Sequence, residues 1–80
     1  MFKVPIEDKL GIMKSISRKF GKTLKRIRVE KKMSQGDIIK ITGMDRGYVS
    51  SLENGRQNPT LATIEKLAKA LGVSTDELLK

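Results

Sequence analysis

The sequence predicts an all-α protein, a compact bundle of about five helices with a basic N-terminal extension. Three observations support this fold class. Apolar residues recur at the three- and four-residue spacings of amphipathic helices. No alternating β-branched run indicates a strand. The two prolines, Pro5 and Pro59, fall outside every helical pattern, where they interrupt no helical hydrogen bond. Eighty residues are enough for one domain with a single core.

The first predicted helix is amphipathic and basic. Its apolar residues follow at spacings of four, four and three: Ile16, Phe20, Leu24 and Ile27. The pattern ends near Lys32, and Ile12 and Met13 would extend it backward on the face of Ile16. Gly21 costs a helix interior about 1 kcal/mol relative to Ala, so a break there is equally open. We therefore assign residues 1-19 to the basic extension, helical or not, and residues 20-80 to the main domain.

Capping residues and glycines mark the remaining helices. Ser, Thr and Asp side chains at a helix N-terminus accept hydrogen bonds from its unpaired N–H groups, and glycine ends helices in the left-handed conformation. Such residues bracket three segments, Ser34 to Gly43, Asp45 to Gly55 and Thr60 to Gly72, and Ser74 opens a last turn or two. Two of these starts carry an acidic residue three positions later, the pattern of a capping box: Ser34 with Asp37 and Ser74 with Glu77.

The apolar residues of these segments predict the core. The fourth helix carries one apolar stripe: Leu61, Ile64, Leu67, Ala68 and Leu71. In the two short helices before it, Ile38, Val49 and Leu52 are the residues that we expect to point inward.

The charge is concentrated at one end of the chain. Residues 1–32 contain eleven Lys and Arg against three acidic residues, whereas residues 33–80 contain six of each, so the whole net charge of +8 lies in the first segment. Such a field favours a polyanionic partner, which is DNA, RNA or an anionic membrane surface. A merely solvated helix face is the alternative.

The composition excludes several kinds of chemistry. Without Cys or His there is no disulfide, no thiol chemistry, no zinc finger and no imidazole acid–base catalysis. The adjacent Asp76 and Glu77 suit helix capping and the helix dipole. We therefore predict no enzyme activity and no cofactor. No window approaches the roughly 20 apolar residues of a membrane span, and acidic residues interrupt the start of the chain, so we expect a cytoplasmic protein without a membrane partner.

The third predicted helix, from Asp45 to Gly55, has an outer face typical of a DNA-reading helix. Two helices of about eight residues joined through a glycine form a helix-turn-helix. The outward residues of the second of them are Arg46, Gly47, Ser50 and Ser51. They are short apart from the arginine, and none is acidic. A major groove about 12 Å wide admits a helix with such a slim face. We therefore expect the helix Asp45-Asn54 to read the major groove of double-stranded DNA.

The sequence also resembles the Xre/Cro/cI helix-turn-helix family of bacterial and phage transcriptional regulators. The resemblance covers Phe20 to Leu79, and three segments carry it in the same order and spacing: "FGKTLKRIRVEKKMSQGDI", "TGMDRGYVSSLENGRQNP" and "LATIEKLAKALGVSTDELL". The segment "DRGYVSSLE" is most similar to small stand-alone members such as restriction–modification controller proteins. The resemblance implies a lambda-repressor-like bundle and sequence-specific DNA binding, with repression as the expected mode of regulation.

The resemblance implies roles for individual residues. Base edges would be faced by Arg46, Gly47, Ser50 and Ser51. Phosphate or flanking backbone contacts are implied for Gln35, Tyr48, Asn54, Arg56 and Gln57. Arg28 and Glu53 match an internal ion pair of the fold. Packing, capping or simple solvation is the alternative for Arg46, Tyr48 and Gln35.

Three departures from the family pattern bear on this reading. Ile39 stands where the family usually has alanine at the close approach of the two helices, and Thr42 replaces an apolar residue. Both would permit a shifted or wider crossing of the helix pair. Gly47 removes a side chain at a common reading position, so DNA shape would carry more of the specificity.

Dimerisation is expected because one such domain offers little surface for tight, specific binding. A homodimer would read half-sites about 34 Å apart. Val73, Leu78 and Leu79 are the candidate interface, unless they only close the core of a monomer.

Other readings remain open. The basic run of the first helix offers a solvated face, extra phosphate contacts or a partner-binding surface. A protein-interaction module of the same fold, such as an antitoxin or a bridging coactivator, would bind through residues 1-19 or 73-80. The chain would also suit the N-terminal domain of a longer regulator.

Overall fold

The computed structural model describes residues 6–80, with side chains from Lys14 onward. Within that range it contains five helices and no strand. The helices are α1 (Ile6–Glu30), α2 (Gln35–Thr42), α3 (Arg46–Glu53), α4 (Leu61–Leu71) and α5 (Thr75–Leu79). The predicted all-α bundle is therefore confirmed.

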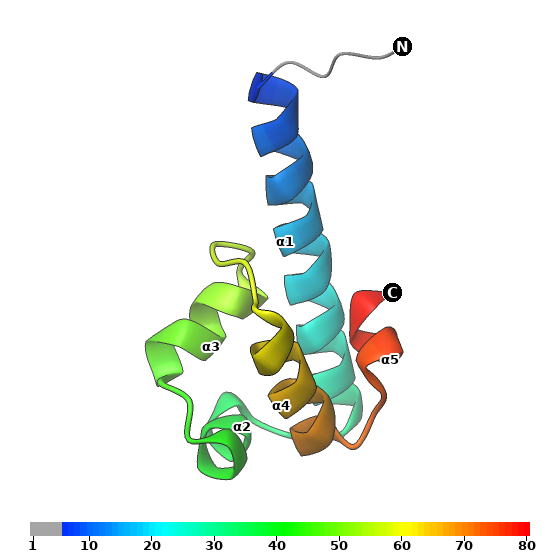
Figure 1. The fold of residues 1–80 in the computed structure, drawn as a ribbon. Helices are drawn as coiled ribbons and strands as arrows, with labels where there is room; N and C mark the ends of the chain where they lie inside the picture. Colours follow the sequence, from blue (N-terminus) through cyan, green and yellow to red (C-terminus); the bar gives the residue numbers. More distant parts are fainter. Residues whose placement is uncertain (1–5) are drawn as a thin grey trace.

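The shorter helices lie around the C-terminal part of the long helix α1 (Figure 1). Over its C-terminal half, α3 packs on one side and α5 on another, while α2 contacts α3 and α4. Its N-terminal part extends beyond the other helices (Figure 1). The two short helices α2 and α3 therefore form a pair on one side of the bundle.

Helix α1 runs through Gly21 without a break. Packing explains why residue 21 is glycine. A Cβ there would overlap the carbonyl oxygen of Leu52 and lie 2.7 Å from that of Glu53. Glycine lets α1 pass the C-terminal end of α3 at backbone distance. Of the two open alternatives, the continuous helix is correct. The expectation for the side chains of Ile12 and Met13 lies outside the described residues.

The predicted caps are present at α2 and α4. Ser34 Oγ accepts from the Asp37 N–H at 3.0 Å and the Ser34 N–H donates to Asp37 Oδ2 at 2.8 Å, which completes the capping box. The hydrogen bond that the Ser34 N–H donates to the Asp37 carboxylate is the largest cause that lowers the pKa of Asp37. Thr60 Oγ1 accepts from the Thr63 N–H. Gly43, at φ 74°, ends α2 in the left-handed conformation, which costs glycine little.

Two helix ends differ from the expectation. Asp45 occupies the N-cap position of α3 but makes no side-chain cap hydrogen bond. At α5, only the Ser74 half of the predicted capping box is formed. Ser74 Oγ accepts from the Glu77 N–H at 3.3 Å, whereas the Glu77 carboxylate lies 3.5 Å from Lys80 Nζ. The end of α1 agrees with the expected end near Lys32, since the helix ends at Glu30 and Lys32 takes a left-handed φ of 57°.

One core joins all five helices. Its buried apolar residues are Phe20, Leu24, Ile27, Ile38, Val49, Leu52, Ile64, Leu67, Ala68, Leu71 and Leu78. Two residues of the predicted apolar stripes lie outside this core, since Ile16 is 61% and Leu61 83% exposed.

Substituting Gly21 by Ala should destabilise the protein although it raises helix propensity. The added methyl overlaps α3 carbonyls, and overpacking costs about 1–3 kcal/mol, more than the ~1 kcal/mol that alanine gains in a helix. The matched control is Gly47→Ala, whose Cβ would meet nothing closer than Asp45 Oδ2 at 3.5 Å. In urea unfolding, the midpoint concentration should be lower than that of the wild type for G21A and not for G47A. Equal midpoints for the two variants would contradict this account of Gly21.

Candidate nucleic-acid interface

The helix pair α2–α3 is built around a tight turn. The Gly43 N–H donates to Ile39 O at 2.8 Å. Thr42 Oγ1 donates to Ile38 O at 2.7 Å and accepts from the Met44 N–H at 3.2 Å. The hydroxyl at position 42, a departure from the family pattern, is therefore satisfied within the turn. Its two bonds tie the end of α2 to the start of the connection to α3.

Apolar contacts hold the two helices against the bundle. Ile38, Val49 and Leu52 are fully buried, as the inward positions required. Ile39 is half-buried and packs against the core. The isoleucine is thus accommodated at the rim of the core.

The outer face of α3 carries the residues expected to face DNA. Arg46 and Gly47 are exposed, and Ser50 and Ser51 are half-buried. The Arg46 guanidinium lies across the first turn of α2, because a Cβ built at Gly36 would stand 3.7 Å from Arg46 Nη2. A cation of α3 therefore lies beside the first turn of α2.

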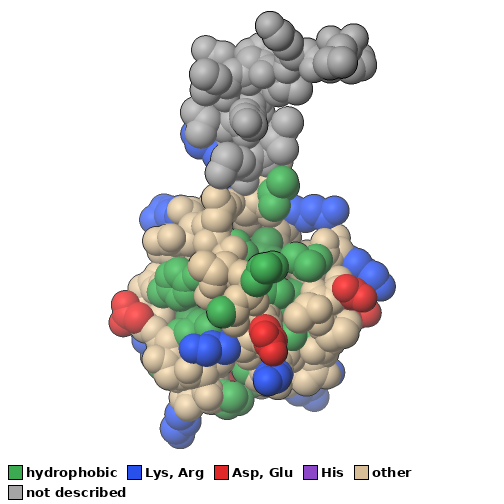
Figure 2. Space-filling view, in the orientation of Figure 1, with side chains coloured by type: hydrophobic (Ala, Val, Ile, Leu, Met, Phe, Trp, Pro, Cys, Tyr) green, Lys and Arg blue, Asp and Glu red, His purple; other side chains and the backbone are tan. Residues whose placement is uncertain are grey.

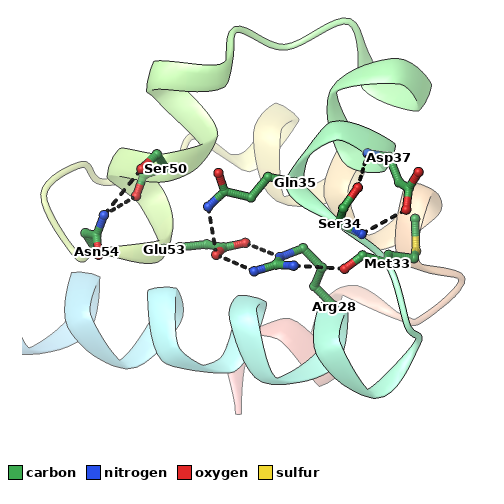
Figure 3. A network of polar contacts seen from close by, with 8 residues as sticks. All are labelled: Arg28, Met33, Ser34, Gln35, Asp37, Ser50, Glu53 and Asn54. Carbon is green, nitrogen blue, oxygen red and sulfur yellow. Dashed lines mark hydrogen bonds and ion pairs between the residues drawn. The ribbon is translucent and has the colours of Figure 1, made fainter.

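A buried polar network fixes α3 to α1 and α2 (Figure 3). Arg28 Nε lies 2.7 Å from Glu53 Oε2 and Arg28 Nη2 lies 3.0 Å from Glu53 Oε1, a bidentate pair. Gln35 Nε2 donates to the same carboxylate at 3.1 Å, and Arg28 Nη1 donates to Met33 O at 2.8 Å. Three helices thus meet at one carboxylate. The internal ion pair implied by the resemblance is present.

The network is almost closed to solvent. The Glu53 side chain is 3% exposed and that of Arg28 is 12% exposed. The hydrogen bond to Glu53 raises the pKa of Arg28 above its usual value. Gln35 has a second amide hydrogen that Glu53 does not take. The carboxylate thus orients the Gln35 amide while leaving it able to donate to a ligand.

The remaining predicted contacts flank the helix pair. Asn54 Nδ2 donates to Ser50 O at 2.9 Å and lies 3.4 Å from Ser50 Oγ (Figure 3). The Tyr48 hydroxyl lies 3.2 Å from Thr63 Oγ1, and its ring packs against the core. Arg56 and Gln57 are exposed on the loop that follows α3. Tyr48 therefore has a packing role in the structure whether or not it contacts DNA.

The loop after α3 is held by α1. Gly55 has φ +71°, and a Cβ there would lie 2.9 Å from Arg18 Cα. Ser17 Oγ donates to Asn58 Oδ1. Sequence reasoning missed these contacts and the Gln35–Glu53 bond, since they join residues far apart in the chain. The left-handed Gly55 was the one local signal of a close approach.

The three candidate interface residues have different surroundings. Leu78 is 1% exposed and belongs to the core, so its expected place on a dimer surface is wrong for this fold. Val73 is half-buried against the core, and Leu79 is 56% exposed. Leu79 lines a groove of about 290 Å³ with Ile16, Phe20, Pro59 and Ile64, together with Asn58. We call these five apolar residues the apolar face.

Figure 2 shows several apolar side chains exposed on the face turned to the viewer. Among the residues that the structure describes, no group of acidic side chains is arranged to hold a metal ion. Over the same part of the chain, no helix has the length and hydropathy needed to cross a membrane.

The fold and its helix pair define a helix-turn-helix protein of the lambda-repressor-like class. Residues 24–78 match the helix-turn-helix family model, and the chain belongs to this family of transcriptional regulators, of the Xre/cI type. The family suggested by the sequence is thus confirmed. The match begins at Leu24, so most of α1 precedes it.

Named relatives include restriction–modification control proteins. Control protein C.MunI of a Mycoplasma species is 40% identical over 67 residues, which cover 82% of this chain and 90% of that protein. The crystal structure of the controller protein C.AhdI from Aeromonas hydrophila has a TM-score of 0.75 and 40% identity, covering 78% of this chain and 94% of that one. The C.Esp1396I tetramer bound to its natural 35-base-pair operator has a TM-score of 0.69 and 33% identity, covering 81% and 96%.

Removal of the Glu53 carboxylate should be among the most destabilising single changes in the protein. Glu53→Ala leaves Arg28 buried without its partner, which typically costs about 3–5 kcal/mol. The double variant Arg28→Met/Glu53→Leu replaces both charges by apolar groups and should be more stable than E53A. Urea unfolding measures both. A double variant less stable than the single one would show that the pair itself, rather than the unpaired charge, dominates.

Proposed function

We propose that this protein is a sequence-specific regulator that places α3 in the major groove of double-stranded DNA, with repression as its mode. The observation that carries the proposal is the outer face of α3, which is slim and free of acidic groups and is held in place by the buried Arg28–Glu53–Gln35 network. A rigid support of this kind suits a helix that must keep its register against base edges. The membership in a family of regulators supports the same function.

We assign reading and positioning to different residues. Arg46 has the planar fork that binds guanine O6 and N7, and it is exposed at the start of α3. Gly47, Ser50 and Ser51 form the rest of the reading face. Gln35, Tyr48, Asn54, Arg56 and Gln57 are assigned to phosphates and the flanking backbone, where contacts position the protein without specifying bases.

Gly47 has a specific part in this proposal. A side chain there would have room, since only Asp45 Oδ2 would lie within 4 Å of its Cβ. Packing therefore does not demand glycine at this position. A glycine there brings the backbone of α3 close to the groove and leaves shape and bending of the DNA to contribute specificity.

A homodimer in the cytoplasm is the proposed working form, as a non-enzymatic regulator. Half-sites about one helical turn apart require two copies of the reading helix in fixed relation. C.Esp1396I binds its operator as a tetramer. The apolar face of this chain, with Leu79 56% exposed, is the surface that we propose for contact with the second copy.

A protein-interaction module is the second candidate, and the same apolar face favours it. Ile16 of that face is 61% exposed, as would suit a different protein partner. Selection of binding sites from a random duplex pool at two salt concentrations separates the candidates. An enriched inverted repeat supports the dimeric reader. Retention without enrichment, lost steeply with salt, favours the interaction module.

Arg46 and Arg56 should respond differently to substitution by Ala. Arg46→Ala should reduce discrimination between the selected site and random DNA by about 1–3 kcal/mol. Arg56→Ala should weaken binding to both alike and make the salt slope about one unit shallower. Titrations of both duplexes at several salt concentrations measure the two effects. Unchanged discrimination in R46A would remove Arg46 from the reading residues.

Leu79→Asp should dissociate the proposed dimer while the fold is retained, because Leu79 is exposed in the single chain. The matched change Leu78→Asp places a charge in the core and should unfold the protein, since Leu78 is 1% exposed. Sedimentation gives the mass, and circular dichroism gives the helix content. A folded L79D variant that stays dimeric would place the interface elsewhere.

A further inference from the structure

The helix-turn-helix part of this chain lacks the charge that DNA binding ordinarily requires. Residues 33–80, which include α2 to α5, contain six Lys and Arg against six Asp and Glu. The phosphate backbone supplies most of the affinity of DNA-binding proteins through neutralisation by cations. Since the part that reads DNA is neutral, the excess positive charge must come from residues 1–32, and among described elements from α1.

Two of the described arginines of α1 are already paired. Arg26 Nη1 lies 3.0 Å from Glu30 Oε1, and Arg28 is held by Glu53. Five other described cations of α1 are exposed and make no ion pair with any group of residues 14–80. Lys19 falls outside the series that the other four form. Those four follow at spacings of four, four and three, which places them along one flank of the helix: Lys14, Arg18, Lys22 and Lys25. We call these four residues the basic flank.

The basic flank lies beside the predicted phosphate-contacting loop. Arg18 adjoins Gly55, whose Cβ would stand 2.8 Å from Arg18 Cγ. One turn away, Gly21 passes the last carbonyls of α3 at backbone distance. Ser17 bonds to Asn58 of the same loop. The flank therefore continues the surface of the loop that carries Arg56 and Gln57, away from the base-reading end of α3.

The length of the basic flank suits a duplex. From Lys14 to Lys25 a helix rises about 16 Å, and over that length B-DNA presents roughly ten phosphate charges. The apolar stripe of the same helix is used elsewhere, since Phe20, Leu24 and Ile27 are buried in the core. An interfacial membrane helix would need that stripe for insertion. Phosphates in water are thus the partner that the flank fits.

We infer that the basic flank of α1 is a second DNA-binding surface, which contacts phosphates outside the bases read by α3 and supplies electrostatic affinity that α2 to α5 lack. This inference rests on the proposed function. It gives a role to Lys14, Arg18 and Lys22, which precede the family match that begins at Leu24, and to Lys25, which lies within that match. Affinity and specificity are then carried by different helices.

The test is the salt dependence of binding in two variants of equal charge. Lys14→Gln/Lys22→Gln removes two cations from the flank, and Lys66→Gln/Lys69→Gln removes two exposed cations from α4. Both keep all residues of the reading face. For the flank variant, the slope of log K against log salt should become shallower by about 1.8. Between 50 and 200 mM salt, the factor by which affinity falls should then be about tenfold smaller for the flank variant than for the wild type. The flank variant should keep its preference for the selected site.

Each outcome has a distinct meaning. Equal slopes in the two variants would overturn the inference and leave the proposed function intact. A wild-type chain that binds selected and random duplexes alike would contradict the proposed function itself. A parallel titration uses vesicles of phosphatidylserine and phosphatidylcholine. Vesicle binding that the flank variant loses, with the DNA slope unchanged, would assign the flank to a membrane surface and reject it as a DNA contact.

Discussion

One buried carboxylate organises the DNA-binding half of this molecule. Glu53, at the end of α3, binds Arg28 of α1 through two hydrogen bonds and Gln35 of α2 through a third. Every orientation of α3 that breaks these bonds would leave charges buried without partners, which is costly. The angle of the reading helix is therefore set by polar geometry as well as by the apolar contacts of Ile38, Val49 and Leu52.

The same network links the fold to the proposed site. Gln35 is fixed by a residue in the interior, while its position at the start of α2 leaves it half-buried at the surface. Across the pair, the Arg46 guanidinium lies near Gly36. A group assigned to phosphate and a group assigned to bases are thus both held beside the first turn of α2. A single rigid arrangement suits recognition that demands both contacts at once.

Most of the fold could be predicted from local signals. Gly43, Gly55 and Gly72 mark helix ends because glycine adopts a left-handed φ at little cost, and all three have such a φ. The periodic apolar residues predicted which face of each helix is buried. Periodicity does not say where along a helix the covering ends, so Ile16 and Leu61 were placed in the core although they are exposed. Leu78 and Leu79 are neighbours on one short helix, and only packing against α1 and α4 separates their environments.

The site was less accessible to sequence reasoning than the fold. The outer face of α3 could be named from its spacing, whereas the bond between Gln35 and Glu53 spans 18 positions in the chain. Asp45 shows the opposite failure, because a residue suited to capping stands at the N-cap position of α3 without making the bond. A local preference is satisfied only when the backbone and its neighbours allow it.

The attachment of the α3–α4 loop to α1 has a consequence for the kinetics of recognition. Gly55 sits against Arg18, and Asn58 bonds to Ser17. The loop therefore loses its conformational entropy when the chain folds, and little remains to be lost on meeting a ligand. Ordering flexible side chains at an interface ordinarily costs about 0.5–1.5 kcal/mol each. A loop already ordered should let the rate of association depend on diffusional encounter, with no slow rearrangement to follow.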